Sequence, residues 1–582
     1  MSKNNIVTAA SDVAANLVGA FPKSVKAAHE FENYNEYLNA NRPSTKQLED
    51  ERTTPLNPAP LISVAMVCVG ESDSKMDATL VSLLAQTYTN WELCIAFELS
   101  KTGLERFNSL EKIRIVLSDG TDKELIALAQ EQLRGAYFLM LSPGDRLAPD
   151  AMYSVAQAML ANRQAEVFYM DEDSVTDEGE RHSPIFKPDY GPDTMLSYNM
   201  TGKPLFVAKR VHEKVGGYIG TGKNDLWEYT IKCMRAAKGV VHIARVGLST
   251  PEEGSNRNMN LHDMRKRLDT ILSERKPVGN SFAGEIENTC RIRYPKKKQP
   301  SVGIVIPNVD DANLLARCIE SIEQQSNSDC IRIFVADNGQ EGETKQNYLR
   351  ALKRNKVATL VEVEASSSMP RILNDCAKQA ISDVLLFLNG SSEILSPGFP
   401  EQLTELVLRK DTGAVGGKIL DAGGNILSVG TVIGLGGWAG SPYTGTPDDE
   451  EDWLKCTFTK VQRNVSAVSG AFMAIGGETF FNSGLFDETI TGVGWDTELC
   501  IRLMRRGLYN CFTPYAVVRL NGTLPDYAKA SAGNLTRCYD AYRQTLLAGD
   551  KYYNFNFDPA SSVPMLAVNP YPPITLNQNY KG

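Results

Sequence analysis

The side chains of this 582-residue sequence that could do chemistry are carboxylates rather than imidazoles or thiols. The five histidines all lie before residue 263, so a reaction in the second half must proceed without imidazole. The eleven cysteines are scattered through apolar runs and form no Cys-x-x-Cys pair, which is typical of reduced, buried thiols in a cytosolic protein. Acidic residues that follow strands or begin helices are therefore the candidates for a site, because carboxylates bind hard cations and act as general bases.

The elements that must position these carboxylates alternate between strand and helix. In the first half, apolar runs that predict buried strands alternate with runs at helical spacing, which predicts parallel βαβ units. The predicted strands are 61–70, 91–99, 113–119 and 136–145, and the predicted helices are 77–86 and 123–133.

The same order recurs in the second half, which predicts a duplicated domain rather than a solenoid. Strands are predicted at 301–308, 330–339, 357–364 and from residue 383, with helices at 312–325 and 370–381. The predicted organisation is an arm or linker over 1–58, a domain over 59–255, a helical linker over 256–299, a second domain over 300–552 and an extended arm over 553–582.

Composition and charge restrict the class of protein. Hydrophobic residues make up 42% and charged residues 23%, which is a globular balance. A net charge of −9 opposes a broad grip on nucleic acid, and the basic PKKKQP stretch is interpreted as a solvated linker. There is no run of 18 apolar residues and no secretory signal pattern at the start, so we expect no transmembrane segment and a cytoplasmic protein, or one built into a larger assembly.

Phrases in both halves resemble a known family. In the first half they include SLLAQTYTNWELCIA, RLAPDAMYSVAQAML and FYMDEDSVTDEGERHSPIFKPDYGPDTMLSYNM, and in the second half SVGIVIPNVDDANLLARCIESI, LLFLNGSSEILSPG and GWDTELCIRLMRRG. Both halves resemble family 2 glycosyltransferases of the GT-A fold, and the tandem is similar to O-antigen and rhamnan-type polysaccharide biosynthesis proteins. The resemblance implies an α/β fold with two tandem GT-A domains, mainly parallel sheets and extended N- and C-terminal arms.

The resemblance also implies roles for residues of the second half. Asp496 matches the catalytic base, with Glu498 two residues later, and Asp337 matches the carboxylate that recognises the base of a nucleotide sugar. The other nucleotide-binding candidates are Pro307, Asn308, Arg371 and Asn374. The glycine-rich stretch 434–440 lacks the strand-then-helix setting of a dinucleotide fingerprint and is interpreted as an acceptor loop or a turn.

The metal loops depart from the family pattern in both halves. The loop that would hold Mg²⁺ or Mn²⁺ reads Ser-Pro-Gly-Asp over 142–145 and Asn-Gly-Ser-Ser-Glu over 389–393, which leaves Asp145 and Glu393 as weak metal candidates. One carboxylate is a poor magnesium site unless substrate phosphates supply most ligands. The sequence therefore predicts no definite cofactor. If the protein is an active enzyme, we expect it to use Mg²⁺ or Mn²⁺.

The first half also lacks other expected side chains. Phe97 and Glu98 replace the base-recognising pair, and Leu226 stands where the catalytic carboxylate belongs, unless a one-residue shift restores Asp225. The sugar-binding candidates are three successive acidic residues, for which an acidic strand end bonded to loop amides is an equal alternative: Asp171, Glu172 and Asp173.

Two functions are left open by these residues. The first is a degenerate, non-catalytic protein that acts as a binding or structural component, with protein partners contacted through its arms. The second is an inverting glycosyltransferase that uses the second domain to move a sugar from a nucleotide-diphosphate donor to a glycan or protein acceptor. Nucleotide sugars or glycans are the expected small partners, and nucleic acid is not.

Overall fold

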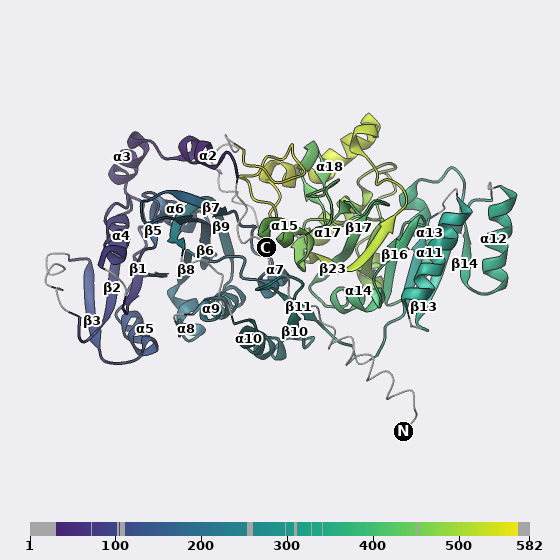
Figure 1. Cartoon of the computed structure of the whole chain (residues 1–582). Coiled ribbons are helices and arrows are strands. Elements are labelled where there is room, and N and C mark those ends of the chain that lie inside the picture. Colours follow the sequence, from purple (N-terminus) through teal and green to yellow (C-terminus); the bar gives the residue numbers. More distant parts are fainter. Residues whose placement is uncertain are drawn as a thin grey trace, which may run out of the picture.

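The computed structural model of the chain describes residues 31–567, except 71–72, 102–103, 105–110, 221, 253–259, 297, 308–310, 327–328, 340–341 and 450–451. These residues form two α/β units that follow one another along the chain (Figure 1). We call residues 62–251 domain 1 and residues 302–548 domain 2. The predicted α/β fold with two successive sheets is confirmed.

Domain 1 is built on a nine-stranded sheet with the order β3-β2-β1-β4-β8-β6-β9-β5, in which β7 pairs with β6. The strands from β3 to β4 are parallel, β8 is antiparallel to both neighbours, and β6 and β9 are again parallel. The strands are β1 (Ile62–Cys68), β2 (Trp91–Glu98), β3 (Ile113–Ser118), β4 (Tyr137–Leu141), β5 (Arg146–Leu147), β6 (Val167–Val175), β7 (Arg181–Ile185), β8 (Leu205–Ala208) and β9 (Val240–Pro251).

Several helices of domain 1 pack on its sheet, whereas α7 packs against β11 (Cys290–Arg293) and β21 (Arg463–Val465) outside it. They are α4 (Asp73–Leu84), α5 (Asp122–Glu131), α6 (Ala151–Ala161), α7 (Pro192–Ser197), α8 (Lys209–Lys214) and α9 (Lys223–Ala236). α5 begins after Thr121, whose backbone N–H donates to the Glu124 carboxylate at 2.6 Å, so a free amide of the first turn is satisfied. Strands covered on both faces read as continuous apolar runs, as the buried β2 does.

Domain 2 repeats this topology strand for strand. Its main sheet has the order β14-β13-β12-β15-β22-β17-β23-β16, and each neighbouring pair has the same direction as its counterpart in domain 1. The strands are β12 (Val302–Ile306), β13 (Ile331–Asp337), β14 (Ala358–Glu362), β15 (Val384–Leu388), β16 (Ser392–Ile394), β17 (Thr412–Leu420), β18 (Ile426–Ser428), β21 (Arg463–Val465), β22 (Phe472–Gly476) and β23 (Tyr509–Leu520). A separate ribbon pairs β19 (Val432–Ile433) with β20 (Ala439–Gly440).

The helices of domain 2 include the two predicted ones, α11 and α13, and six that were not among the predicted helices. The set is α11 (Ala312–Gln325), α12 (Glu343–Arg354), α13 (Met369–Gln379), α14 (Phe399–Val407), α15 (Trp453–Thr459), α16 (Gly477–Asn482), α17 (Trp495–Arg505) and α18 (Ala532–Ala548), with short 3-10 turns η3 (Leu435–Gly437) and η4 (Tyr527–Lys529).

Segments outside the two sheets connect the domains. The linker holds α10 (Leu261–Ser273) and a hairpin of β10 (Asn280–Ala283) and β11 (Cys290–Arg293), which lie between the domains in Figure 1. The stretch expected to be an N-terminal arm contains the helices α2 (Tyr34–Asn41) and α3 (Thr45–Thr53), and α3 begins with a capping box of Ser44 and Gln47. Residues 549–567 contain no helix and no named strand and consist of turns and bends with a bridge between Phe557 and Leu566.

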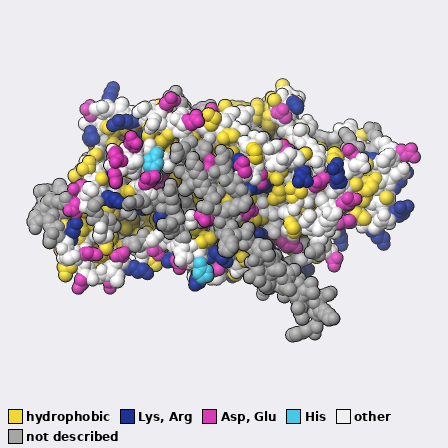
Figure 2. All heavy atoms as spheres, in the orientation of Figure 1, with side chains coloured by type: hydrophobic (Ala, Val, Ile, Leu, Met, Phe, Trp, Pro, Cys, Tyr) yellow, Lys and Arg dark blue, Asp and Glu magenta, His cyan; other side chains and the backbone are white. Residues whose placement is uncertain are grey.

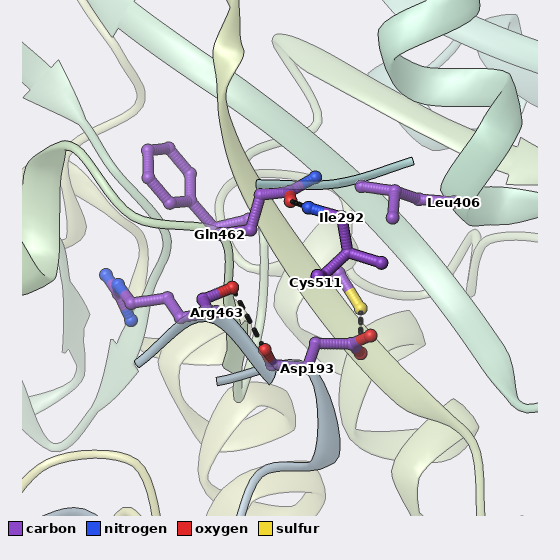
Figure 3. Close-up of a pocket in the computed structure, with 8 residues that line it drawn as sticks. Asp193, Ile292, Leu406, Gln462, Arg463 and Cys511 are labelled. Carbon is purple, nitrogen blue, oxygen red and sulfur yellow. Dashed lines mark hydrogen bonds between the residues drawn. The ribbon is translucent and has the colours of Figure 1, made fainter. Parts of the chain in front are cut away.

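Domain 1 and domain 2 share a buried interface centred on an ion pair. Asp193 at the start of α7 pairs with Arg409 of domain 2, and both side chains are nearly inaccessible to solvent. The Asn464 amide donates to Asp193 at 2.9 Å, and the Cys511 thiol lies 3.1 Å from the same carboxylate. Figure 3 shows Asp193 and Cys511 beside a cavity of about 10 Å³, the size of one water molecule.

Apolar packing is continuous across this interface. One buried cluster includes Val167 and Trp227 of domain 1, Ile292 of the linker and Val415 of domain 2. On the face shown in Figure 2, basic and acidic side chains are interspersed among the described residues, without a broad basic area. No helix in the described part of the chain is long and apolar enough to span a bilayer.

Candidate functional site

The predicted base, Asp496, lies in the first turn of α17 in domain 2. One carboxylate oxygen accepts from the backbone N–H of Gly470 and the other from that of Thr497, each at 2.8 Å. Burial raises the pKa of Asp496, and these amide hydrogen bonds oppose the shift. The residue is half-buried rather than enclosed, and no cation among the described residues forms an ion pair with it. This is a carboxylate able to accept a proton.

An aromatic pair lies close to Asp496. The rings of Trp438, in the glycine-rich loop, and Tyr527 stack with a centroid distance of 6.2 Å and an interplanar angle of 2°. The hydroxyl groups of Tyr527 and Tyr542 are 2.9 Å apart, and Tyr542 donates to the carbonyl of Gly494, two residues before Asp496. Burial, followed by the charge of Asp496, raises the pKa of Tyr527. The pair therefore belongs to the same site as the predicted base.

Glu498 faces a different environment. Its carboxylate forms an ion pair with Arg502 one turn later, with a shortest N–O distance of 2.5 Å. Arg502 also donates to the carbonyl of Leu485 at 2.9 Å. Through Arg502, Glu498 thus helps to hold α17 against the preceding loop.

The predicted nucleotide residues are divided between exposed and buried positions. Asp337 ends β13 and accepts from the backbone N–H of Gly339 at 3.0 Å and from the Gln346 amide at 3.3 Å. Arg371 is about half exposed on α13, 4.0 Å from Asp375. Both side chains can reach a ligand at the strand ends.

Asn374 and Pro307 are buried, and Asn308 lies outside the described residues. The Asn374 side chain donates to the Phe486 carbonyl and accepts from the Phe486 amide, both at 3.0 Å, and also donates to Glu488. All of these contacts are internal, so Asn374 joins α13 to the loop before α17.

The metal-loop position of domain 2 is occupied by an acid with cationic neighbours. Glu393 lies 3.3 Å from Arg519 and 3.6 Å from Arg317, and the Asn521 amide donates to it at 3.4 Å. β16 pairs with β23 so that Glu393 is directly opposite Arg519. The carboxylate offered as a metal candidate is therefore neutralised by guanidinium groups.

The metal-loop position of domain 1 is occupied by an ion pair as well. Asp145 is 2% exposed, and its Oδ2 lies 2.9 Å from the Lys203 ammonium. Lys203 also donates to the Ser142 hydroxyl at 2.8 Å, and the Ser142 amide donates to Asp145 at 2.7 Å. A fixed ammonium group therefore lies where the loop would hold a metal ion.

The start of α9 in domain 1 distinguishes the two alternatives for its base position. Asp225 pairs with Arg267 of α10 at 2.7 Å and accepts from the backbone of Gly222 at 3.0 Å. Leu226 instead lines a cavity at the ends of β1 and β4. Of the two alternatives, Leu226 is therefore the one that lines the cavity of domain 1.

The three successive acids of β6 are buried, and each has internal partners. Asp171 accepts from the Asn554 amide of the C-terminal stretch and from His242 at 2.8 Å. The nearest cations of the other two acids are Lys187, 3.6 Å from Glu172, and Arg181, 2.6 Å from Asp173. The Tyr34 hydroxyl of α2 also donates to Asp173 at 2.5 Å. Segments from both ends of the chain thus meet on β6.

The sequence of domain 2 is similar to a known protein family. Residues 300–541 match the family described as "Glycosyltransferase like family 2". Domain 2 is a glycosyltransferase-like family 2 domain.

Full-length relatives extend the similarity to domain 1. The chain is 28% identical over 548 residues to O-antigen biosynthesis protein RfbC of Myxococcus xanthus, a match covering 90% of this chain and 42% of that protein. It is 29% identical over 488 residues to the uncharacterized protein y4gI of Sinorhizobium fredii, covering 79% of this chain and 53% of the relative. The chain therefore spans about half the length of these relatives.

Solved structures of glycosyltransferases align with parts of the chain. GalNAc-T7 with UDP, GalNAc and Mn²⁺ aligns at 18% identity and a TM-score of 0.36, covering 44% of this chain and 51% of that one. The mannosyltransferase PcManGT of Pyrobaculum calidifontis aligns at 14% identity and a TM-score of 0.29, covering 38% of this chain and 57% of that one.

The residues of neither domain fit the divalent cation that the resemblance implies. Among the described residues there is no group of three or more His, Cys, Asp and Glu side chains placed to hold a metal ion. In the family 2 domain Glu393 is paired with arginines, and in domain 1 Asp145 is paired with Lys203. A hard divalent cation needs several oxygen ligands, which these loops do not supply.

Lys203 and Arg519 are the residues of these loops that sequence reasoning missed. Lys203 is 58 positions from Asp145, and Arg519 is 126 positions from Glu393. The sequence provided only an indirect signal: each metal loop has a single carboxylate, too few for a divalent cation. Only the folded structure shows which segment supplies the ammonium or guanidinium group beside it.

Proposed function

We propose that this chain is a glycosyltransferase-like component of O-antigen-type polysaccharide biosynthesis that does not carry out metal-assisted sugar transfer and acts as a binding and structural protein. We infer the biosynthetic setting from the name of the Myxococcus xanthus relative, O-antigen biosynthesis protein RfbC. The observation that carries the proposal is the charge placed at the two metal loops: Lys203 on Asp145 and the arginines on Glu393.

The size of the rate acceleration that a metal ion and a general base would supply supports this proposal. A divalent ion contributes several kcal/mol by stabilising the charge of a leaving diphosphate. Domain 1 in addition has Leu226 at its base position, and general-base catalysis is worth about 10²–10⁴ in rate. Domain 1 has therefore lost both contributions.

The terminal segments give the structural part of the proposal. Asp173 holds α2 and Asp171 holds the C-terminal stretch on β6, while Glu172 pairs with Lys187, and we assign the three acids these internal roles rather than sugar binding. The further parts of the arms, outside the described residues, are the proposed contact points for protein partners.

Nucleotide release from UDP-, GDP- and dTDP-sugars tests the proposal. The full chain is incubated with each sugar and a glycan acceptor, with Mn²⁺ or with EDTA. We expect no release above the rate of hydrolysis without protein under either condition. Mn²⁺-dependent release that Glu393→Gln abolishes would overturn the proposal.

A second candidate function is inverting transfer by the family 2 domain alone, and Asp496 specifically favours it. Its carboxylate has a raised pKa, hydrogen bonds from backbone amides and the stacked pair Trp438 and Tyr527 close by. Aromatic faces of this kind pack against apolar faces of ligands, and a raised pKa brings a base closer to neutral pH.

The second candidate predicts turnover that persists in EDTA. Asp496→Asn should then reduce turnover by about 10²–10⁴-fold, because the proton of the attacking hydroxyl loses its acceptor. Asp487→Asn is the matched control, since Asp487 is a half-buried acid of the preceding loop whose carboxylate accepts from nearby Thr489. Equal turnover in the two variants would exclude Asp496 as the base.

A further inference from the structure

Domain 1 contains a cavity of about 170 Å³ that none of the proposed functions uses. It lies at the ends of β1 and β4, between α5 and α9, where open α/β sheets bind ligands. Its apolar walls include Ile126, Leu133, Met140 and Leu226. We call it the domain 1 cavity.

One side of the domain 1 cavity is aromatic. Phe138 and His212 are in edge-to-face contact with a centroid distance of 4.3 Å, and Tyr218 and Tyr229 are in similar contact at 5.3 Å. His212 links the two pairs, because its Nδ1 lies 2.7 Å from the Tyr229 hydroxyl. An aromatic ring entering the cavity would find edge-to-face partners, an arrangement that adds to the gain from burial alone.

The polar end of the domain 1 cavity presents hydrogen-bond donors. The Lys203 ammonium lines it and has three protons, two of which are directed to Asp145 and Ser142. The Gln130 side chain, which also lines the cavity, is committed to the backbone: it donates to Ile126 and Tyr218 and accepts from Tyr218. A ligand must therefore bring an acceptor for the remaining Lys203 proton.

The charges near this end balance, which selects an uncharged ligand. Lys203 pairs with Asp145 at 2.9 Å, and Lys187 lies 3.6 Å from Glu172, whose carboxylate also accepts from the Lys203 backbone. A carboxylate or phosphate brought beside Asp145 would meet a charge of the same sign in a poorly solvated place. An oxygen acceptor without charge avoids that cost.

The volume sets the size of the ligand. Sites for drug-sized ligands have volumes of about 300–1,000 Å³, so the domain 1 cavity is too small for a nucleotide-diphosphate sugar. An engineered apolar cavity of about 150 Å³ in another protein binds benzene. The domain 1 cavity is therefore of the size that holds a single six-membered ring with a short substituent.

We propose that the domain 1 cavity binds a small, uncharged aromatic molecule that bears one acceptor oxygen, with its ring among Phe138, Tyr229 and Leu226 and its oxygen at Lys203. Leu226, near the start of α9, forms part of the apolar wall. This inference does not depend on the function proposed above.

Ligand-observed NMR on the full chain tests the proposal with three probes of similar size. We expect acetophenone to bind, toluene to bind at least threefold more weakly because it lacks the acceptor, and benzoate to bind most weakly because it is charged. No binding of acetophenone at millimolar concentration, or benzoate as the tightest probe, would overturn the proposal. This series uses the unaltered protein, so it does not depend on the folding of a variant.

Two substitutions then locate the site. Leu226→Trp fills the cavity and should weaken acetophenone binding by at least tenfold, whereas Ile185→Trp, at an exposed position of domain 1, should leave binding unchanged. Thermal unfolding of both variants verifies that they are folded. Equal binding by the two folded variants would show that acetophenone binds elsewhere and would overturn the assignment.

Discussion

Single residues decide what each domain can do, because the two domains share one topology. Asp496 in the first turn of α17 presents a carboxylate, whereas Leu226 near the start of α9 lines an apolar cavity. Lys203 has a comparable effect at the metal loop, where its ammonium supplies the positive charge next to Asp145. Activity therefore does not follow from topology in either domain.

Removing Lys203 tests its structural role. Lys203→Met leaves the 2% exposed Asp145 without its cation, so we expect the free energy of unfolding to fall by about 1–3 kcal/mol. Lys209→Met is the matched control, because that lysine forms an exposed pair with Glu213 and should change stability by less than about 0.5 kcal/mol. Equal losses in urea denaturation would contradict the assignment.

The sequence identified the loop acids Asp145 and Glu393 because each follows a strongly apolar strand. It could not identify their partners, since Lys203 comes from the loop before β8 and Arg519 from β23, and only the fold brings these segments alongside the acids. It likewise left Asp225 and Leu226 as alternatives. That choice depended on Arg267 of the linker helix, which holds Asp225 away from the crevice.

At the scale of elements, β6 of domain 1 is the strand on which both terminal segments meet. Its buried acids require positive charge or hydrogen-bond donors, and these come from α2, β7, β9 and the C-terminal stretch. His242 of β9 is the titratable member. Burial lowers its pKa, but the carboxylates of Asp171 and Asp189 outweigh burial and raise the pKa to about 9.

The raised pKa makes the stability contribution of His242 depend on pH. A group whose pKa is higher in the folded state stabilises fully below its unfolded pKa of about 6.5 and loses that contribution as pH rises through about 9. We expect His242→Gln to remove a fall in unfolding free energy on the order of 2–3 kcal/mol between pH 6.5 and 9.

Urea denaturation across this pH range measures the effect. His262→Gln on the exposed face of α10 is the control and should retain the fall seen in the unaltered chain. A His242→Gln profile parallel to that of the control would contradict the role assigned to His242.

At the scale of elements the sequence predicted the first four strands of each main sheet and several helices closely, including 312–325, because apolar spacing marks them. The helices α2 and α3 were not predicted, since their segment is mostly polar and the capping of α3 by Ser44 and Gln47 gives a weak signal. The acids 171–173 were placed correctly after an apolar run, but the arms that cover them are distant in sequence.

At the scale of the whole molecule, the two domains behave as one packed unit. Their sheets were predictable from the internal repeat, whereas their interface was not, because Asp193 and Arg409 are 216 positions apart. Burial would raise the pKa of Asp193, but the Arg409 guanidinium outweighs it and holds that pKa well below its usual range. The pair thus stays charged inside the interface.

Breaking this pair should weaken the whole fold. Arg409→Met leaves Asp193 charged and buried, so we expect a loss of about 3–5 kcal/mol in unfolding free energy. Arg210→Met, which breaks a more exposed pair with Glu166, should cost less than about 1 kcal/mol. Separate unfolding transitions for the two domains in Arg409→Met would further indicate that the interface couples them, and a loss no larger than that of Arg210→Met would contradict it.

The central claim is that side-chain cations, and not a divalent ion, provide the positive charge at the two loops. Electron paramagnetic resonance of Mn²⁺ titrated into the full chain with saturating UDP, GDP or dTDP measures this directly. The account predicts that the signal of free Mn²⁺ is the same as with the nucleotide alone. Stoichiometric loss of that signal, restored by Asp145→Asn or Glu393→Gln, would contradict it.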